Sequence, residues 1–165
     1  MDVCDAVMSR RDLETRQKIL KDSRVGAFAV ICIGILMLAQ FSGILSFIEL
    51  GDRSISMGLL VVPVASRICA AFAVINMKPM STSQYFNLSR KSIFNVVLGI
   101  LLIAMAAILV LCGLSERILV SAGVTMIMYL ICALYGSKML GGMNGDISGY
   151  SLTIGELAGI IGLII

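Results

Sequence analysis

Residues 26–50 have the sequence GAFAVICIGILMLAQFSGILSFIEL, a predominantly apolar run that carries no charge before Glu49. A run of about 20 such residues is long enough to cross the hydrocarbon core of a bilayer as a helix. Four further runs of this kind follow at residues 55–77, 92–114, 118–135 and 147–165. The sequence therefore predicts an all-α protein, a polytopic transmembrane bundle of about five helices.

The composition agrees with a membrane protein. Of the 165 residues, 59% are hydrophobic and only 14% are charged, whereas roughly a quarter of the residues of a soluble domain are charged. The first 25 residues are polar and lack the apolar core of a signal peptide. We therefore expect a cytoplasmic N-terminal segment with an aspartate motif and an amphipathic helix at residues 1–25, and a transmembrane domain at residues 26–165. The net charge of +3 does not imply a nucleic-acid partner.

The distribution of lysine and arginine predicts the orientation in the membrane. Residues 1–25, 78–91 and 136–146 contain six, three and one of these residues, ten in all, whereas the loops at 51–53 and 115–117 contain one each. Basic residues concentrate on the cytoplasmic side of a membrane. We therefore expect a multi-pass protein of the cell inner membrane, with its N-terminus and its active site on the cytoplasmic face of the lipid bilayer.

The chain contains no histidine. This excludes histidine-ligated zinc, a Ser-His-Asp triad and a Cys-His dyad, so a bound metal would be a hard ion held by oxygen atoms. Four of the five cysteines lie within apolar runs, and no two of them form a close C-x-x-C pair. We interpret them as small buried apolar side chains.

Acidic residues in the N-terminal segment form the first candidate site. Asp2 and Asp5 are three residues apart, a spacing that places both carboxylates on one face of a helix, where they could share a divalent cation. The alternative is two solvated acids near a terminus. Asp22 or Ser23 suits the N-cap of the first membrane helix, and Arg24 suits the headgroup zone. Asp5 and Asp22 could meet at one metal only if the chain folds back between them.

The segment GGMNGDISG at residues 141–149 forms the second candidate site. Its glycines, which include Gly142 and Gly145, leave the backbone free to approach a ligand, and the start of the following helix favours an anion. Asp146 would repel a phosphate unless it holds Mg²⁺, which would then face the phosphate. The alternative is a flexible reverse turn with Asp146 as an N-cap.

Two charges lie within the predicted membrane helices. Arg67 and Glu156 are expensive to place in a bilayer and are therefore candidates for a functional role. Arg67 could neutralise a phosphate or a buried carboxylate. The alternative is that the two residues pair with each other as a structural element.

Three separated segments carry a resemblance to a known family. They are DVCDAVMSRRDLETRQKILKDSRVGAFAV at residues 2–30, VVPVASR at residues 61–67 and LGGMNGDISGYSLTIGE at residues 140–156. In this order they resemble the cobalamin synthase family, the membrane-bound adenosylcobinamide-GDP ribazoletransferases. The family begins its first motif with the pattern D-G-x-x-D-x-x-D-[GA], of which Asp2, Asp5 and Ala6 correspond to the last part. The family's N-terminal part, including the first aspartate, is lacking here, and Asn144 replaces the usual threonine.

The resemblance implies an Mg²⁺-dependent transfer in vitamin B12 biosynthesis. The corrinoid phosphoryl group of adenosylcobinamide-GDP would pass to α-ribazole or its 5′-phosphate, and GMP would leave. Such a reaction needs carboxylates that hold a metal and cations that meet phosphate oxygens. We therefore expect the following roles: Asp2, Asp5, Asp146 and Asp22 as metal ligands; Arg24, Arg67, Lys138, Gly142 and Gly145 in substrate binding; and Asp5, Asp146 and Glu156 in catalysis.

Three alternatives stay open at this point. A membrane phosphotransferase of the CDP-alcohol type would also use spaced aspartates, although no second aspartate pair follows Asp5 in the same hairpin. A small transporter subunit could line a polar path with Arg67 and Glu156. An N-terminally truncated, inactive fragment is the third. The sequence also leaves open whether the chain forms a homo-oligomer.

Overall fold

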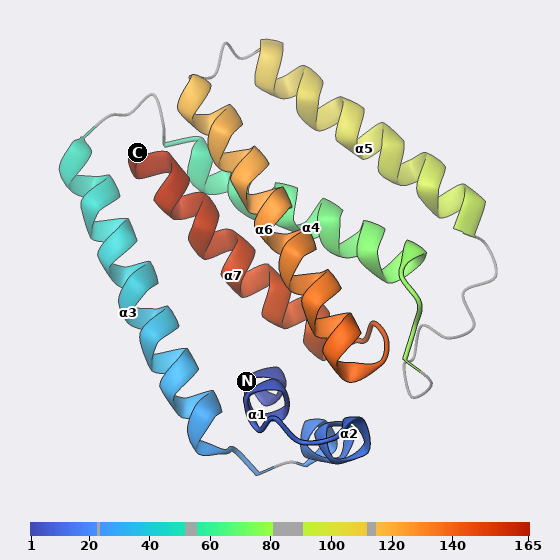
Figure 1. The fold of residues 1–165 in the computed structure, drawn as a ribbon. Coiled ribbons are helices and arrows are strands. Elements are labelled where there is room, and N and C mark those ends of the chain that lie inside the picture. Colours follow the sequence, from blue (N-terminus) through green and yellow to red (C-terminus); the bar gives the residue numbers. More distant parts are fainter. Residues whose placement is uncertain (23, 52–55, 81–90, 112–114) are drawn as a thin grey trace.

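The protein is a bundle of helices with a small helical pair across one end (Figure 1). The structure is a computed structural model that describes residues 1–22, 24–51, 56–80, 91–111 and 115–165. In order, its helices are α1 (Asp2–Met8), α2 (Leu13–Lys21), α3 (Ala27–Leu50), α4 (Gly58–Asn76), α5 (Lys91–Leu111), α6 (Glu116–Leu140) and α7 (Gly145–Ile164). The described residues form no β-strand, and one isolated bridge joins Pro79 to Met143.

Four of the described helices, α3, α4, α6 and α7, are long and apolar enough to cross a bilayer. A shorter apolar stretch, Ile93–Met105, lies in α5. Much of the outer surface is apolar, as on α3, where Ile35 and Leu38 are both more than half exposed. A bundle with such a surface needs lipid or further apolar chain around it. The prediction of an all-α polytopic membrane bundle is therefore confirmed.

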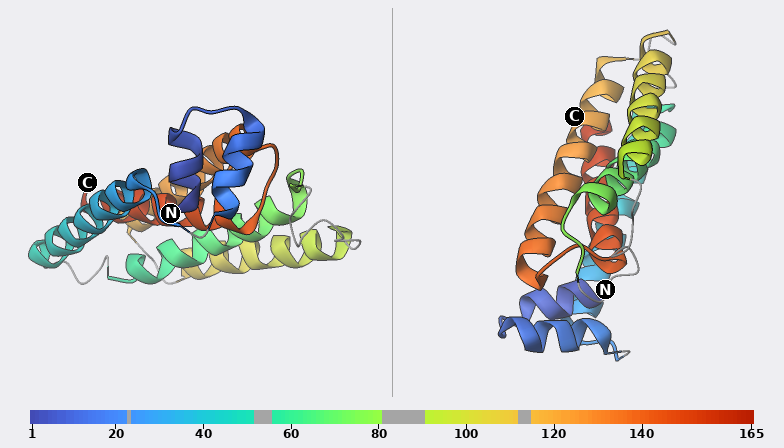
Figure 2. Two further views of the ribbon diagram at one scale, coloured as in Figure 1. Left: turned by 90° about the horizontal axis from the view of Figure 1, so that it is seen from below. Right: turned by 90° about the vertical axis from the view of Figure 1, so that its right-hand side faces the viewer.

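The hairpin of α6 and α7 forms the centre of the bundle. The two helices run antiparallel, with α3 beside α7, α4 against both, and α5 on the outer side of α4 (Figure 1). The helices α1 and α2 lie across one end of the bundle, where α6 ends and where α3 and α7 begin (Figure 2). The predicted N-terminal segment and the 141–144 turn are thus at the same end, and the C-terminus is at the other.

Small residues allow α6 and α7 to approach closely. The Ser121 hydroxyl donates to the Gly159 carbonyl oxygen over 2.6 Å, and a Cβ atom on Gly155 would lie 3.1 Å from the Thr125 carbonyl oxygen. In lipid, helices associate through close packing and interhelical hydrogen bonds rather than through the hydrophobic effect. This seam therefore stabilises the hairpin on which the other helices pack.

The turn between α6 and α7 is shorter than the predicted loop at residues 136–146. The helix α6 continues to Leu140 and ends at Gly141, whose φ of 85° is the left-handed conformation of a C-terminal cap. Two α2 side chains satisfy the last carbonyl groups: Arg16 Nη1 donates to Met139 O over 3.2 Å and Gln17 Nε2 to Leu140 O over 2.8 Å. Contacts with a helix more than 100 residues earlier thus extend α6 beyond its predicted end.

The predicted cap of the first membrane helix also differs. The N-cap residue of α3 is Gly26, which has no side chain to cap with. Asp22 pairs with Arg24 instead, and Ser23 lies outside the described residues. The cap is supplied by a side chain of α1, described below.

Replacing Gly159 with alanine should destabilise the bundle. A Cβ atom there would overlap Thr125 Oγ1 and come within 2.9 Å of Val62 Cγ1, so α4 and α6 would have to shift. We expect a loss of about 1–3 kcal/mol, typical of an overpacked core, measured as thermal unfolding in detergent. Gly123→Ala on α6 is the control, because a Cβ there meets nothing within 4 Å. Equal melting temperatures for the two variants would contradict the close seam.

Candidate functional site

The carboxylate of Asp5 joins the N-terminal helices to the membrane bundle. Its Oδ2 accepts a hydrogen bond from Gly26 N over 2.8 Å, and its Oδ1 accepts one from Ala29 N over 2.9 Å. The residue is 8% exposed. An anion at this place satisfies unpaired N–H groups of α3 and lies at the positive end of its dipole. In this structure Asp5 therefore acts as a helix cap supplied from α1.

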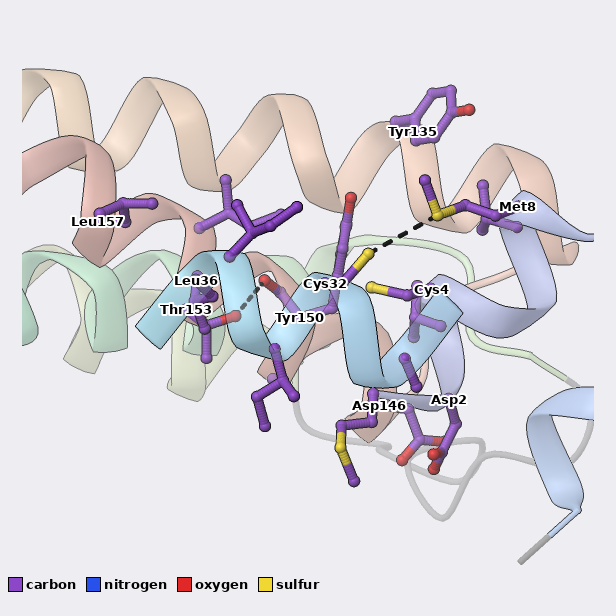
Figure 3. Close-up of a pocket in the computed structure, with 18 of the residues that line it drawn as sticks. Asp2, Cys4, Met8, Cys32, Leu36, Tyr135, Asp146, Tyr150, Thr153 and Leu157 are labelled. Atoms are coloured by element: carbon purple, nitrogen blue, oxygen red, sulfur yellow. Dashed lines mark hydrogen bonds between the residues drawn. The ribbon is translucent and has the colours of Figure 1, made fainter. Parts of the chain in front are cut away.

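Asp2 and Asp146 line the same cavity. The cavity has a volume of about 800 Å³ and lies between α1, the first turns of α3 and the first half of α7, with Tyr135 of α6 at its side. Figure 3 shows the two carboxylates gathered at one end of it. Residues 144 positions apart in the sequence thus meet, because α1 packs against the start of α7.

The start of α7 holds Asp146 in a defined orientation. Asn144 is the N-cap: its Oδ1 accepts from Ile147 N over 2.9 Å, and its Nδ2 donates to Asp146 Oδ2 over 2.8 Å. The alternative in which Asp146 itself is the N-cap is therefore wrong. The exposed Asp146 side chain is left with carboxylate oxygen available on the cavity side, next to the first-turn N–H groups that favour an anion.

The two loop glycines predicted to bind substrate have different surroundings. A Cβ atom on Gly145, which lines the cavity, would meet nothing within 4 Å. Gly142 has a φ of 152° and is pressed against the chain at Met80, where a Cβ would lie 2.7 Å from the backbone nitrogen. Its own N–H donates to Ser137 O over 2.9 Å. The backbone at Gly142 therefore lies in the tightly packed part of the turn, against residues 78–80 that follow α4.

None of the three predicted phosphate-binding cations lines the cavity. Arg24 donates to Asp22, and this hydrogen bond holds the pKa of the Asp22 carboxyl below its usual range. Lys138 is exposed on the last turn of α6, where a positive charge suits the helix dipole. Arg67 lies within α4. Asp22, the fourth predicted metal ligand, is likewise absent from the cavity wall.

Arg67 and Glu156 form an ion pair in the middle of α4 and α7. Arg67 Nη1 donates to Glu156 Oε1, and Ser66 Oγ donates to the same oxygen over 2.7 Å. Glu156 lies ten residues after Asp146, about 15 Å along α7 at 1.5 Å per residue. The structure thus forms the pairing proposed as the alternative, and it keeps the pair apart from the two cavity carboxylates.

The cavity wall also contains residues to which the sequence analysis gave no role. Among them are Cys4, Met8, Cys32, Tyr135, Tyr150 and Thr153. Cys32 Sγ lies 3.7 Å from Met8 Sδ (Figure 3). Burial raises the pKa of the Cys4 thiol to about 11, so it stays protonated at neutral pH and is a poor nucleophile. A signal for this wall was present in the sequence: Gly145 and Gly149 are one helical turn apart and leave one face of α7 open.

Fold and site together define a polytopic membrane protein with a carboxylate-edged apolar cavity at one end of its bundle. The profile of the family described as Cobalamin-5-phosphate synthase matches residues 1–164. The chain belongs to this family. No solved structure matches it.

Three curated relatives illustrate the similarity, and each is named adenosylcobinamide-GDP ribazoletransferase. The protein of Clostridium botulinum is 35% identical over 97% of this chain and 64% of its own length. That of Clostridium perfringens is 33% identical over 98% and 64%, and that of Halalkalibacterium halodurans is 34% identical over 95% and 62%. The chain therefore spans slightly less than two thirds of the length of these relatives.

The role of Asp5 as a cap can be separated from a role in catalysis. Asp5→Asn places an amide nitrogen against one of two backbone donors, so we expect a loss of stability of about 1–3 kcal/mol. Asp2→Asn should change stability by less than about 0.5 kcal/mol, because Asp2 has no such bonds among the described residues. Circular dichroism melting in detergent measures both. An Asp5→Asn chain that melts like the parent but has lost its activity would contradict the capping role.

The pair of Arg67 and Glu156 should behave as a structural unit. Arg67→Met or Glu156→Leu alone leaves one charge unpaired in an apolar environment, which costs about 3–5 kcal/mol for a buried pair. Because 60% of the Arg67 side chain is exposed, the lower end of this range is expected. The double variant should recover most of the loss in a melting experiment. Additive losses in the double variant would show that the two residues do not act together.

Proposed function

We propose that this chain carries the active site of an adenosylcobinamide-GDP ribazoletransferase, which joins adenosylcobinamide-GDP to α-ribazole or its 5′-phosphate and releases GMP. Membership of the family supports the reaction class, and the names of the relatives support the substrates. The observation that carries the proposal is that Asp2 and Asp146 lie together at one end of a cavity. Both residues belong to motifs on which the family resemblance depends.

The cavity carboxylates fit a magnesium ion. Mg²⁺ is usually held by one or two carboxylates together with waters and substrate phosphates, rather than by a complete cage of protein ligands. Asp2 and Asp146 provide two such carboxylates, and the described residues contain no group of three or more His, Cys, Asp or Glu side chains arranged to hold a metal. No Lys or Arg is among the described residues that line the cavity. When bound, Mg²⁺ would neutralise the diphosphate charge that these carboxylates would otherwise repel.

The residues of the chain position the reaction in the following way. A ribose hydroxyl of the acceptor attacks the phosphorus next to the corrinoid, a phosphorus–oxygen bond forms there, and the bond to the GMP oxygen breaks. The N-terminal turn of α7 offers N–H groups to phosphate oxygens beside Asp146. The hydroxyl proton leaves at the carboxylate end of the cavity, where Asp2 and Asp146 are the available acceptors. Asn144 keeps the Asp146 carboxylate turned to this end.

We also propose that this end of the bundle faces the cytoplasm. The basic N-terminal segment, Lys78 and Lys138 all lie there, at the end to which α1 and α2 pack. Basic residues concentrate on the cytoplasmic side, which is also the side where nucleotide-activated substrates are found. The protein would then be a multi-pass protein of the cell membrane, embedded in the lipid bilayer, with its active site on the cytoplasmic face.

The proposal predicts magnesium-dependent GMP release that requires Asp146. Purified in detergent with adenosylcobinamide-GDP and α-ribazole 5′-phosphate, the chain should release GMP, and Asp146→Asn should slow release at least 100-fold. Glu14→Gln is the matched control, since Glu14 is an exposed acid on α2 paired with Lys18. The Clostridium botulinum relative, assayed in parallel, establishes that substrates and detergent are suitable. Full, magnesium-dependent release by Asp146→Asn would contradict the site, and no release beside an active relative would contradict the function of this chain.

A further inference from the structure

The two ends of the cavity differ in chemistry. At one end lie the carboxylates of Asp2 and Asp146, whereas the rest of the wall is mainly apolar and contains Ile33, Leu36 and Leu157 (Figure 3). Such a division suits a ligand with a charged or hydroxyl-bearing part and an apolar part. It does not suit a uniformly polar ligand.

The cavity has the size of a nucleoside site. Its volume of about 800 Å³ lies within the range of roughly 300–1,000 Å³ that is usual for pockets holding drug-sized molecules. Of the two proposed substrates, the acceptor α-ribazole is of this size. The donor carries a corrin ring with many amide side chains in addition to a guanosine diphosphate, and it is much larger.

The polarity of the wall also favours the acceptor. The amide groups around a corrin ring would each need a hydrogen-bond partner, and burying them without one is costly. No Asn, Gln, Lys or Arg is among the described residues of the wall, and the Thr153 hydroxyl already donates to Tyr150 O over 2.9 Å. The base of α-ribazole is a flat, dimethylated benzimidazole, which needs apolar contact. Aromatic and sulfur-containing side chains, as in Tyr150 and Cys32, provide such contact.

The spacing along α7 matches the length of a nucleoside. Gly149 and Thr153 follow Asp146 by three and seven residues, about 5 and 10 Å along the helix axis. A ribose placed beside Asp146 would therefore have its base beside Gly149 and Thr153. A Cβ atom on Gly149 would meet nothing within 4 Å, so this position leaves the cavity open at the level of the base.

We propose that the apolar part of this cavity binds the benzimidazole base of the acceptor nucleoside, and that Gly149 determines how large a base it admits. The inference rests on the proposed function for the identity of the nucleoside. The acceptor would thus lie inside the cavity between α1, α3 and α7. The larger donor would lie outside it, on the other side of Asp2 and Asp146.

The test fills the cavity at Gly149 and measures binding of α-ribazole by titration calorimetry on the full chain in detergent with Mg²⁺. Gly149→Ala should weaken binding less than threefold and Gly149→Leu at least tenfold. Both variants favour helix formation over glycine, so folding is maintained. Gly123→Leu is the matched control, because it adds the same side chain at an open glycine of α6 that does not line the cavity, and it should leave binding unchanged.

Two further measurements show which part of α-ribazole the cavity binds and which of the two substrates the Gly149 variants affect. Removing the two methyl groups of the base should weaken binding by about fourfold for each methyl group. In the transfer assay, Gly149→Leu should raise KM for α-ribazole at least tenfold, with kcat and KM for adenosylcobinamide-GDP within twofold of the parent values.

The outcomes separate this inference from the proposed function. Binding that follows the Gly149 series in a chain without transferase activity supports the nucleoside site and contradicts the function. Activity with no effect of Gly149→Leu on KM for α-ribazole, or with a rise in KM for the donor instead, overturns the inference alone. A bound lipid that mass spectrometry detects and α-ribazole does not displace would also overturn it, because the cavity would then hold an acyl chain.

Discussion

The hydrogen bonds of Asp5 determine the position of the N-terminal helices, on which the rest of the site depends. One carboxylate accepts from Gly26 N and Ala29 N and so fixes α1 to the start of α3. Because α1 is held there, Asp2 is brought to Asp146 at the start of α7, and the wall of the cavity is closed on one side. The interaction is electrostatic and local, and it links the short helix α1 to α3, which is long and apolar enough to cross a bilayer. Asp5, which the sequence analysis predicted to bind metal, therefore has a structural role in this fold.

Much of the fold could be predicted from the sequence, because lipid imposes a simple rule. Each crossing needs about 20 apolar residues with their backbone groups paired within the helix, and the run at residues 26–50 satisfies that rule without further information. Helix ends were harder to predict. The helix α6 ends at Leu140, five residues after its predicted end, and Arg16 and Gln17 reach its last carbonyl groups from α2. The cap of α3 likewise comes from Asp5, 21 residues before Gly26. Local sequence patterns do not contain such long-range contacts.

The candidate site could be predicted in part. The family motifs pointed to Asp2 and Asp146, and the structure places both on the cavity. Spacing alone could not show that Asp5 turns toward α3, since a three-residue interval puts two side chains on one face but does not determine their partners. Nor could it show that Arg67 faces Glu156 rather than a substrate, because this depends on how α4 rotates against α7. The apolar wall was missed for a similar reason: Cys32 and Tyr150 resemble ordinary core residues until α1 is placed over them.

The contacts between α2 and the end of α6 have a consequence for how the protein is made. Arg16 and Gln17 are synthesised before their partners, Met139 and Leu140, which are 123 residues further along the chain. The carboxylates of the site are even further apart, since Asp146 follows the turn. The contacts of α2 with α6 can therefore form only after residue 140 has been synthesised, whereas the contacts of Asp5 with α3 can form earlier. Until α6 and α7 have inserted, the nascent protein can lie in the membrane but has no cavity. Assembly of the cavity thus requires α7 to be in place beside α1 and α3.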